Sequence, residues 1–303
     1  MTPDELLDAL IRLRKAAVGG RRVPHKPLLL LWLCGRYSTT GSSAVTYAEA
    51  EEQVSRLIND FGPPVVSAAA QRQRAAMPFV HLERTLWDLK DGEGHPIGPD
   101  APERGKWLRD RGAHGQLHPE VELLLSDPGT LISAVRLLLD QHFTPSLEAL
   151  ICSGAGLDLA GLEESAHPVV PPKPKRPRRS GFAEEVLRAY AFACAMCGYD
   201  GALARNPVGL EAAHVRWHSQ DGPDDVSNAL ALCALHHALF DLGVLGLTAD
   251  LRIRVSGLYV ARNKAGLAID ALAGHPLAAP RPGKPPVDLT FVTWHDRQVF
   301  KDS

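Results

Sequence analysis

Apolar residues in the first half of the chain recur at the spacing of amphipathic helices. They fall every three or four positions in segments 4–15, 47–59 and 120–142, whereas 28–34 is a short, nearly continuous apolar run. These patterns predict helices. Pro27 immediately precedes the apolar run and suits the first turn of a helix, because its missing N–H needs no partner there. The N-terminal half is therefore expected to be mainly helical.

Three shorter segments interrupt this helical pattern. We predict a turn at 77–80, around Pro78, that leads into a strand at 82–89. The segment 102–115 combines basic residues with glycine, and it is predicted to be a loop.

Alternating apolar and polar residues become the main pattern in the second half. They predict a strand at 208–215 and a second short strand at 229–233, with a polar loop that contains glycine and proline between them at 217–225. Segment 235–242 then has the composition of a helix. We expect one small unit built as strand, loop, strand and helix.

The length of 303 residues is typical of two domains. A proline-rich stretch at 165–180 cannot form a helix or a central strand, so we place a linker there, between domains 1–164 and 181–303. Its basic residues are Lys173, Lys175, Arg176, Arg178 and Arg179. Each would neutralise a DNA phosphate and release counterions, and the alternative is a merely solvated spacer.

Two pairs of soft metal ligands bracket the strand–loop–strand segment. They are Cys194 with Cys197, and Cys233 with His236. Two residues between paired ligands let one tight turn aim both at a single ion, and structural Zn²⁺ takes four such ligands. The alternative for a Cys-x-x-Cys pair is a redox dithiol, which needs a thioredoxin-like βαβ context that is not seen here. We therefore predict a structural zinc site, with 35 residues inserted between the pairs.

His214, Asn228 and His237 occur in this order inside and just after the zinc frame. The motifs that contain them are Glu211-Ala-Ala-His214-Val, Asn228-Ala-Leu-Ala-Leu-Cys233 and His236-His237-Ala-Leu-Phe-Asp241. This set resembles the HNH endonucleases, and in particular their McrA-like branch. The resemblance implies a ββα-metal fold in which His214 is the general base, Asn228 holds the loop that bears it, and His237 binds a catalytic divalent ion such as Mg²⁺ or Mn²⁺.

One departure from the HNH pattern concerns the catalytic metal. Many members of that family carry an acidic ligand directly before the first histidine, and here that position is Ala213. Glu211, His218 and Asp241 are candidates for the remaining ligands, and the sequence does not choose among them.

Phosphodiester hydrolysis requires these residue types for a physical reason. A water molecule must lose a proton near neutral pH, and a neutral imidazole with a pKa of about 6.5 suits that step. The leaving oxygen gains negative charge, which a divalent cation stabilises. A lone histidine in a strand is usually a satisfied core residue. His214 is instead one of a patterned set, which favours the catalytic role.

Short motifs across residues 1–160 resemble the sulfur-binding domain that accompanies HNH modules in McrA-like type IV restriction enzymes, which recognise phosphorothioated DNA. These motifs are Pro24-His25-Lys26-Pro27, Met77-Pro78-Phe79 and Gly112-Ala-His114-Gly115. The resemblance implies that the ring of Pro78 forms a shallow apolar cup for the sulfur, with Met77 where a tyrosine is often found. The alternative for Pro78 is an ordinary turn proline.

Recognition of sulfur in place of oxygen is physically reasonable. Pressing a phosphate oxygen against an apolar ring without a donor costs on the order of 1–3 kcal/mol, and the more weakly hydrated sulfur costs less. Cations bind either phosphate equally and supply affinity without discrimination. The candidate DNA-binding residues are Arg22, His25, Lys26, Arg104, Arg109 and His114. The two histidines would donate hydrogen bonds or contact a base edge, and each cation has the alternative of being a solvent-facing charge.

Composition narrows the interpretation only slightly. With 45% hydrophobic and 22% charged residues the chain resembles a globular protein, and its formal net charge of −2 gives no electrostatic argument for DNA binding. A polar, acidic start and the lack of a long apolar run predict neither a signal peptide nor a membrane span. Cys34 and Cys152 lie outside the zinc set in apolar settings, which favours a reducing cytoplasm over a disulfide framework.

The combined hypothesis is an α+β protein with a mainly helical DNA-reading domain and a ββα-metal HNH domain that holds structural zinc. It would cut double-stranded, phosphorothioated DNA, and a homodimer is expected for a double-strand cut because one active site cuts one strand. Two alternatives remain open. One is a non-catalytic DNA-binding regulator. The other is a reader of methylated or hydroxymethylated bases, whose aromatic cage would come from Tyr37, Tyr47, Phe79, Trp87 and Trp107.

Overall fold

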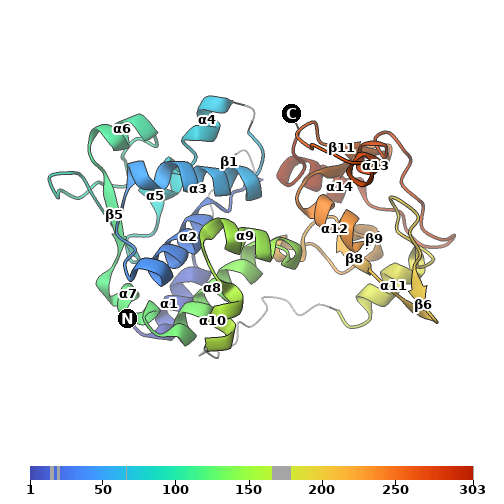
Figure 1. Cartoon of the computed structure of the whole chain (residues 1–303), viewed down its shortest axis with the longest axis horizontal. Helices are drawn as coiled ribbons and strands as arrows, with labels where there is room; N and C mark the ends of the chain where they lie inside the picture. Colours follow the sequence, from blue (N-terminus) through green and yellow to red (C-terminus); the bar gives the residue numbers. More distant parts are fainter. Residues whose placement is uncertain (14–16, 19–20, 66, 166–178, 303) are drawn as a thin grey trace. The chain divides into compact units, whose positions relative to one another are not determined.

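The chain falls into two compact units, Met1–Pro174 and Lys175–Ser303 (Figure 1). A computed structural model describes residues 1–13, 17–18, 21–65, 67–165 and 179–302. The predicted linker at 165–180 therefore lies largely outside the described residues, together with four of its five basic side chains. None of the described helices combines the length and the apolar character that a bilayer span requires.

The N-terminal unit is mainly helical, as the hydrophobic spacing predicts. Its helices are α1 (Pro3–Ile11), α2 (His25–Thr40), α3 (Tyr47–Phe61), α4 (Ala68–Arg72), α5 (Ala76–His81), α6 (Gly105–Asp110), α7 (Pro119–Leu125), α8 (Pro128–His142), α9 (Glu148–Ala155) and α10 (Leu159–Ser165), with a 3-10 turn at Pro145–Leu147. Capping boxes at Thr2 and Thr46 fix the starts of α1 and α3, because each threonine side chain accepts a hydrogen bond from a backbone N–H that the helix leaves unpaired.

Helix α2 forms the centre of this unit (Figure 1). It buries its leucine run completely and packs against α3, α5, α7, α8 and α9. A small antiparallel sheet lies beside the helices in the order β3 (Val45–Thr46), β5 (His114–Leu117) and β4 (Trp87–Lys90), and a short pair joins β1 (Ala17–Val18) to β2 (Arg21–Arg22). The apolar run at 28–34, predicted to be helical, is thus part of the helix around which the other helices assemble.

The three interrupting segments differ from their predicted forms. Residues 77–80 belong to α5, where Pro78 occupies the third helical position and its missing N–H costs no hydrogen bond. The strand predicted at 82–89 shrinks to β4, because the N–H groups of Leu86 and Trp87 both bond to the Glu83 carbonyl in a turn. The predicted loop at 102–115 contains α6 and the first residues of β5.

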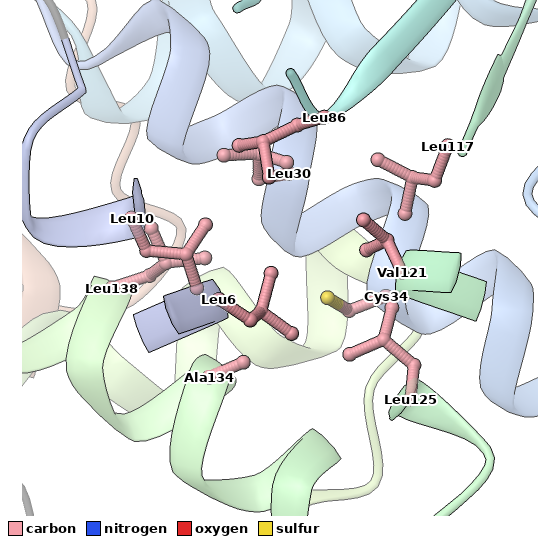
Figure 2. Close-up of a pocket in the computed structure, with 10 residues that line it drawn as sticks. All are labelled: Leu6, Leu10, Leu30, Cys34, Leu86, Leu117, Val121, Leu125, Ala134 and Leu138. Carbon is pink, nitrogen blue, oxygen red and sulfur yellow. The ribbon is translucent and has the colours of Figure 1, made fainter. Parts of the chain in front are cut away.

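A cavity of about 10 Å³ lies in the core of this unit. It is lined by side chains from α1, α2, α7 and α8, by Leu86 just before β4 and by Leu117 at the end of β5 (Figure 2). The residues around it are Leu6, Leu10, Leu30, Cys34, Leu86, Leu117, Val121, Leu125, Ala134 and Leu138. This lining is apolar throughout, and an enclosed water would need polar partners that it does not offer. The cavity is therefore a packing void and not a binding site.

Substitution of Leu138 by alanine is expected to destabilise the N-terminal unit by about 2–5 kcal/mol, because it removes buried methyl groups and enlarges an existing void. Leu138 is only 1% exposed. Urea denaturation followed by circular dichroism measures the change. Leu123→Ala is the matched control, since this α7 side chain is 73% exposed. Equal midpoints for the two variants would contradict the prediction.

The C-terminal unit is built on a two-stranded ladder followed by a helix. Its helices are α11 (Phe182–Ala189), α12 (Ala234–Asp241), α13 (Lys264–Asp270) and α14 (Leu289–Gln298), and 3-10 turns lie at His218–Gln220 and Val226–Asn228. Its strands are β6 (Ala202–Leu203), β7 (Asn206–Pro207), β8 (Leu210–His214), β9 (Ala229–Cys233), β10 (Leu245–Leu247) and β11 (Ile253–Val255). Strands β8 and β9 are antiparallel, and α11 and α12 pack on them (Figure 1).

The register of this ladder fixes where the polar residues lie. Leu210 pairs with Cys233 at one end, and His214 pairs with Ala229 at the other. The predicted strand, loop, strand and helix are confirmed in that order. Helix α14 closes the unit through His295, which stacks on Phe240 with ring centroids 3.7 Å apart and bonds to the Phe240 carbonyl at 3.0 Å.

Candidate functional site

The four predicted zinc ligands meet at one end of the ladder. The ligand atoms of Cys194, Cys197, Cys233 and His236 all lie within 4.8 Å of one another. A tight turn brings Cys197 back towards Cys194, since the N–H of Gly198 donates to the Cys194 carbonyl at 2.8 Å. Gly198 has a φ of 74°, a left-handed conformation that favours glycine. The structure therefore gathers a set that could hold a metal ion.

The three thiols of this cluster differ in how readily they lose a proton. Burial opposes ionisation of Cys194, but hydrogen bonds from His236 and nearby backbone N–H groups lower its pKa to about 6. Burial and the neighbouring Cys194 thiolate raise the pKa of Cys197 to about 12, and burial also raises that of Cys233. The cluster alone thus favours a single thiolate. A bound zinc ion would stabilise all three in the deprotonated, ligating form.

His214 is the last residue of β8 and lies at the end of the ladder away from the zinc ligands. It is four positions along from Leu210 at the start of the strand, a distance of about 13 Å along the strand. Its Nε2 is 2.8 Å from Oδ1 of Asp224, and its ring stacks on Phe182 with centroids 4.7 Å apart and an interplanar angle of 26°. The His218 ring is 5.8 Å away. His214 is only 8% exposed, so these neighbours determine how its ring is oriented.

Asn228 ties together the loop that follows His214. Its Oδ1 accepts from the N–H of Arg216 at 2.8 Å, and its Nδ2 donates to the carbonyls of Arg216 at 3.0 Å and Pro223 at 2.9 Å. The side chain is fully buried. Gly222 completes the loop, because a Cβ there would lie 1.8 Å from the Arg216 carbonyl oxygen. The amide thus holds both sides of the loop that begins at the histidine.

His237 lies on α12 between two carboxylates. Its Nδ1 is 2.6 Å from Oε2 of Glu211, which projects from β8, and its Nε2 is 3.1 Å from Oδ2 of Asp241 one helical turn away. Trp217 donates its indole N–H to Asp241 at 3.0 Å. Two of the three candidates for extra metal ligands thus contact His237, whereas His218 lies beside His214.

The charge around His237 also suits a cation. Burial by itself would lower the pKa of His237, but the hydrogen bonds and charges of Asp241 and Glu211 outweigh burial and raise the pKa to about 9. The same acceptors that stabilise a proton on this ring would stabilise a divalent ion, for which imidazole and carboxylate are common ligands.

In the N-terminal unit, His25 and Lys26 lie at the start of α2 and are buried. His25 Nε2 is 3.0 Å from Nη2 of Arg74, and burial together with the charge of Arg74 lowers the pKa of His25 to about 3. Lys26 Nζ forms an ion pair with Glu83 at 2.7 Å. Pro78 is also buried in α5. These three predicted DNA-binding residues therefore have little exposed surface in the absence of DNA.

Of the other predicted DNA-binding residues, Arg104, Arg109 and His114 are exposed or partly exposed. Arg104 is exposed and precedes α6, and Arg109 at the end of that helix forms an ion pair with Glu51. His114 begins β5, where its Nδ1 lies 3.3 Å from the Gly112 carbonyl. Arg22 lies in β2, paired with Ala17.

A protein-family model described as ScoMcrA-like, DNA sulfur-binding domain, matches residues 3–160. The chain belongs to this sulfur-binding family. A second model, HNH endonuclease, matches residues 194–248 and spans the four metal-binding candidates as well as His214, Asn228 and His237. The sulfur-binding family thus supplies the N-terminal unit, and an HNH domain supplies the core of the C-terminal one.

Solved structures give further points of comparison. The "Modification dependent TagI restriction endonuclease" is 26% identical with a TM-score of 0.32, and the match covers 40% of this chain and 38% of that one. The "Sulfur binding domain of SprMcrA complexed with phosphorothioated DNA" is 20% identical with a TM-score of 0.42, over 54% of this chain and 97% of that one. The corresponding ScoMcrA domain is 20% identical with a TM-score of 0.40, over 52% and 96%. No curated protein matches the sequence.

Asp224 and Phe182 are the site residues that the sequence did not single out. Asp224 lies in a polar loop, where aspartate commonly forms turns. Phe182 is the first residue of α11, which precedes the first zinc-ligand pair in the sequence. Neither position carries a motif. Only the folded unit shows that both contact His214.

Proposed function

We propose that this chain is a modification-dependent DNA endonuclease that binds phosphorothioated DNA through its N-terminal unit and hydrolyses a nearby phosphodiester through its HNH domain. The observation that carries the proposal is the presence, in one chain, of a sulfur-binding family match over residues 3–160 and an HNH match over residues 194–248 that contains His214, Asn228 and His237. Zn²⁺ held by the Cys/His set would have a structural role, because its four ligands leave no open position.

In the proposed reaction His214 takes a proton from the attacking water. Its bond to Asp224 orients the ring, and Asn228 keeps the adjoining loop in place. His237 and Glu211 would hold the catalytic Mg²⁺ or Mn²⁺, which supplies positive charge to the scissile phosphate and the leaving oxygen. Asp241 accepts from the other ring nitrogen of His237 and so presents Nδ1 towards Glu211.

For the reader, we propose that Pro78 distinguishes sulfur from oxygen and that His25 donates a hydrogen bond to the bound DNA. Arg74 is always a donor, so the Nε2 of His25 must accept and its Nδ1 carries the proton. Across the part of the chain that the structure describes, this buried N–H has no hydrogen-bond partner. A ligand oxygen would satisfy it. Arg22, Lys26, Arg104, Arg109 and His114 would complete the contact with the DNA backbone.

The alternative reader, an aromatic cage for a modified base, receives less support. Tyr47, Phe79 and Trp87 are fully buried, and Phe79 meets each of the other two rings edge to face with centroids 5.2 Å apart. These three rings form core structure and cannot enclose a flipped base. Two separate HNH sites are needed to cut both strands at once, so we propose that the active form is a homodimer.

Cleavage of matched duplexes tests the proposal. Unmodified, phosphorothioated and base-methylated DNA are incubated with the protein in Mg²⁺ or Mn²⁺, and binding is measured separately with His214→Ala. We expect cutting of the phosphorothioated duplex alone and a binding preference of about 10-fold to 100-fold, which corresponds to the smaller desolvation cost of sulfur. Equal cutting of all three duplexes would refute the sulfur reader, and cutting of the methylated duplex alone would identify a base reader.

A further inference from the structure

Arg179 makes an unusual set of contacts with the loop beside His214. Its backbone N–H donates to Oδ2 of Asp224 at 2.5 Å, and its side-chain Nε and Nη2 donate to the Asp224 carbonyl at 3.1 and 3.0 Å. Gly181, with a φ of 77°, then turns the chain into α11. One residue thus fixes both the main chain and the carboxylate of Asp224.

A second route joins Arg179 to the same histidine. The Arg179 guanidinium carbon lies 5.9 Å from the centroid of the Phe182 ring, and Phe182 in turn stacks on His214. Asp224 meets the edge of the imidazole through Nε2, and Phe182 covers its face. Arg179 therefore contacts both residues that hold the histidine ring.

We propose that Arg179, Asp224 and Phe182 form a clamp that positions His214 for proton abstraction, with Asp224 selecting the tautomer and Arg179 holding Asp224. This inference rests on the proposed role of His214 as general base. The Asp224 carboxylate accepts a hydrogen bond from the Nε2–H of His214, so the lone pair of the neutral ring is on Nδ1. When the ring becomes protonated, the same carboxylate stabilises the imidazolium.

The electrostatics of Asp224 agree with this geometry. Burial would favour its neutral form, but hydrogen bonds from the Arg179 N–H and from His214 outweigh burial and lower the pKa of Asp224. The Asp224 side chain is only 9% exposed. The charged and titratable groups around the imidazole include Asp224, the His218 ring and, behind Asp224, the Arg179 guanidinium. The Asp224 side chain is therefore ionised at neutral pH and can pair with His214 when its ring becomes protonated.

A different role for Arg179 follows from its sequence position. It is the last basic residue of the proline-rich stretch and would be a phosphate contact if it behaved like a solvated linker cation. Its guanidinium is instead engaged by the Asp224 carbonyl and by Glu185, 2.6 Å away. The two roles predict different kinetics, because a phosphate contact contributes to binding whereas a positioning contact contributes to the rate of the bound complex.

Single-turnover cleavage of phosphorothioated DNA by the full-length zinc-loaded protein separates the two roles. At saturating protein we expect Asp224→Asn to lower the rate about 10-fold to 100-fold. We expect Arg179→Ala to lower it about tenfold, because the backbone N–H still bonds to Asp224. DNA affinity and its salt dependence should stay unchanged in both. Arg188→Ala is the matched control, since it removes an exposed arginine paired with Glu184 on α11.

The opposite kinetic pattern would overturn the clamp. If Arg179→Ala weakened binding, reduced the slope of log affinity against log salt by about one and left the saturated rate unchanged, Arg179 would be a phosphate contact. The Arg179 side chain is half-exposed, so its replacement is compatible with folding. Zinc content and the unfolding midpoint verify this for each variant.

Nitrogen-15 NMR of the histidine rings gives a readout that does not depend on cleavage. In the DNA-free protein His214 should show a proton on Nε2, and Asp224→Asn should shift the tautomer equilibrium whereas Arg188→Ala should not. Unchanged His214 signals in Asp224→Asn would refute the clamp even if the enzyme cuts DNA. If the wild-type protein cuts no duplex but the tautomer shifts as expected, the proposed function fails, whereas the contact by which Asp224 selects the tautomer of His214 is upheld.

Discussion

Cys233→Ser is expected to abolish metal binding and to unfold the C-terminal unit while the N-terminal unit remains folded. Zinc binding in structural sites contributes about 10–16 kcal/mol in peptides, comparable with or larger than the whole stability of a typical domain. Cys233 ends β9 and directly precedes α12, so loss of the metal removes the link that holds this strand and helix to the Cys194–Cys197 turn. The effect should therefore extend well beyond the ligand cluster.

Metal analysis and thermal unfolding together test this expectation. The wild type should contain one zinc per chain, and Cys233→Ser should contain none and lose the unfolding transition of the C-terminal unit. Cys152→Ser is the control, because this thiol is buried in the N-terminal unit. It should retain zinc and alter only the N-terminal transition. One zinc per chain in Cys233→Ser would show that the ion binds elsewhere.

His214→Ala should reduce the rate of strand cleavage by about 10²–10⁴, which is the usual contribution of a general base. DNA affinity should be unchanged, because the residue is 8% exposed and acts on the water and not on the DNA as a whole. Single-turnover assays with protein in excess measure the chemical step, and a gel-shift titration measures affinity. We therefore expect the cleavage rate to fall and the DNA affinity to stay at the wild-type value.

His275→Ala is the matched control for this experiment, because it removes an exposed histidine from the same unit. It should cleave like the wild type. A variant lacking His214 that still cuts DNA at the normal rate would refute the mechanism. A variant that loses binding and cleavage together would instead show that His214 supports the fold of its loop.

The sequence was most informative where the site is built from short spacings. The zinc cluster depends on two turns of four residues each, and the ββα unit depends on alternating and helical patterns that are local in the chain. The side-chain partners are different. Lys26 meets Glu83 across 57 positions, His25 meets Arg74 across 49, and neither pairing has a local signal. Cations that looked available in the sequence therefore proved to be engaged.

Pro78 illustrates a second limit of sequence patterns. Proline next to small and apolar residues indicated a turn, yet the residue lies in the first turn of the short helix α5. Both outcomes satisfy the ring, because the first turn of a helix and the second position of a turn each require no N–H. Tertiary packing decided between them, since Phe79 is buried between Tyr47 and Trp87.

The clamp proposed for His214 also bears on where the HNH domain can be separated from the N-terminal unit and joined to another protein. The HNH match begins at residue 194 and contains every metal ligand and the three motif residues, but it omits Arg179 and Phe182. A fragment trimmed to the edge of the match would keep the four metal ligands and the three motif residues. It would lose Phe182, which covers the face of the His214 ring, and Arg179, which holds Asp224. A chimaera that joins this nuclease to another recognition domain should therefore place its junction before Arg179.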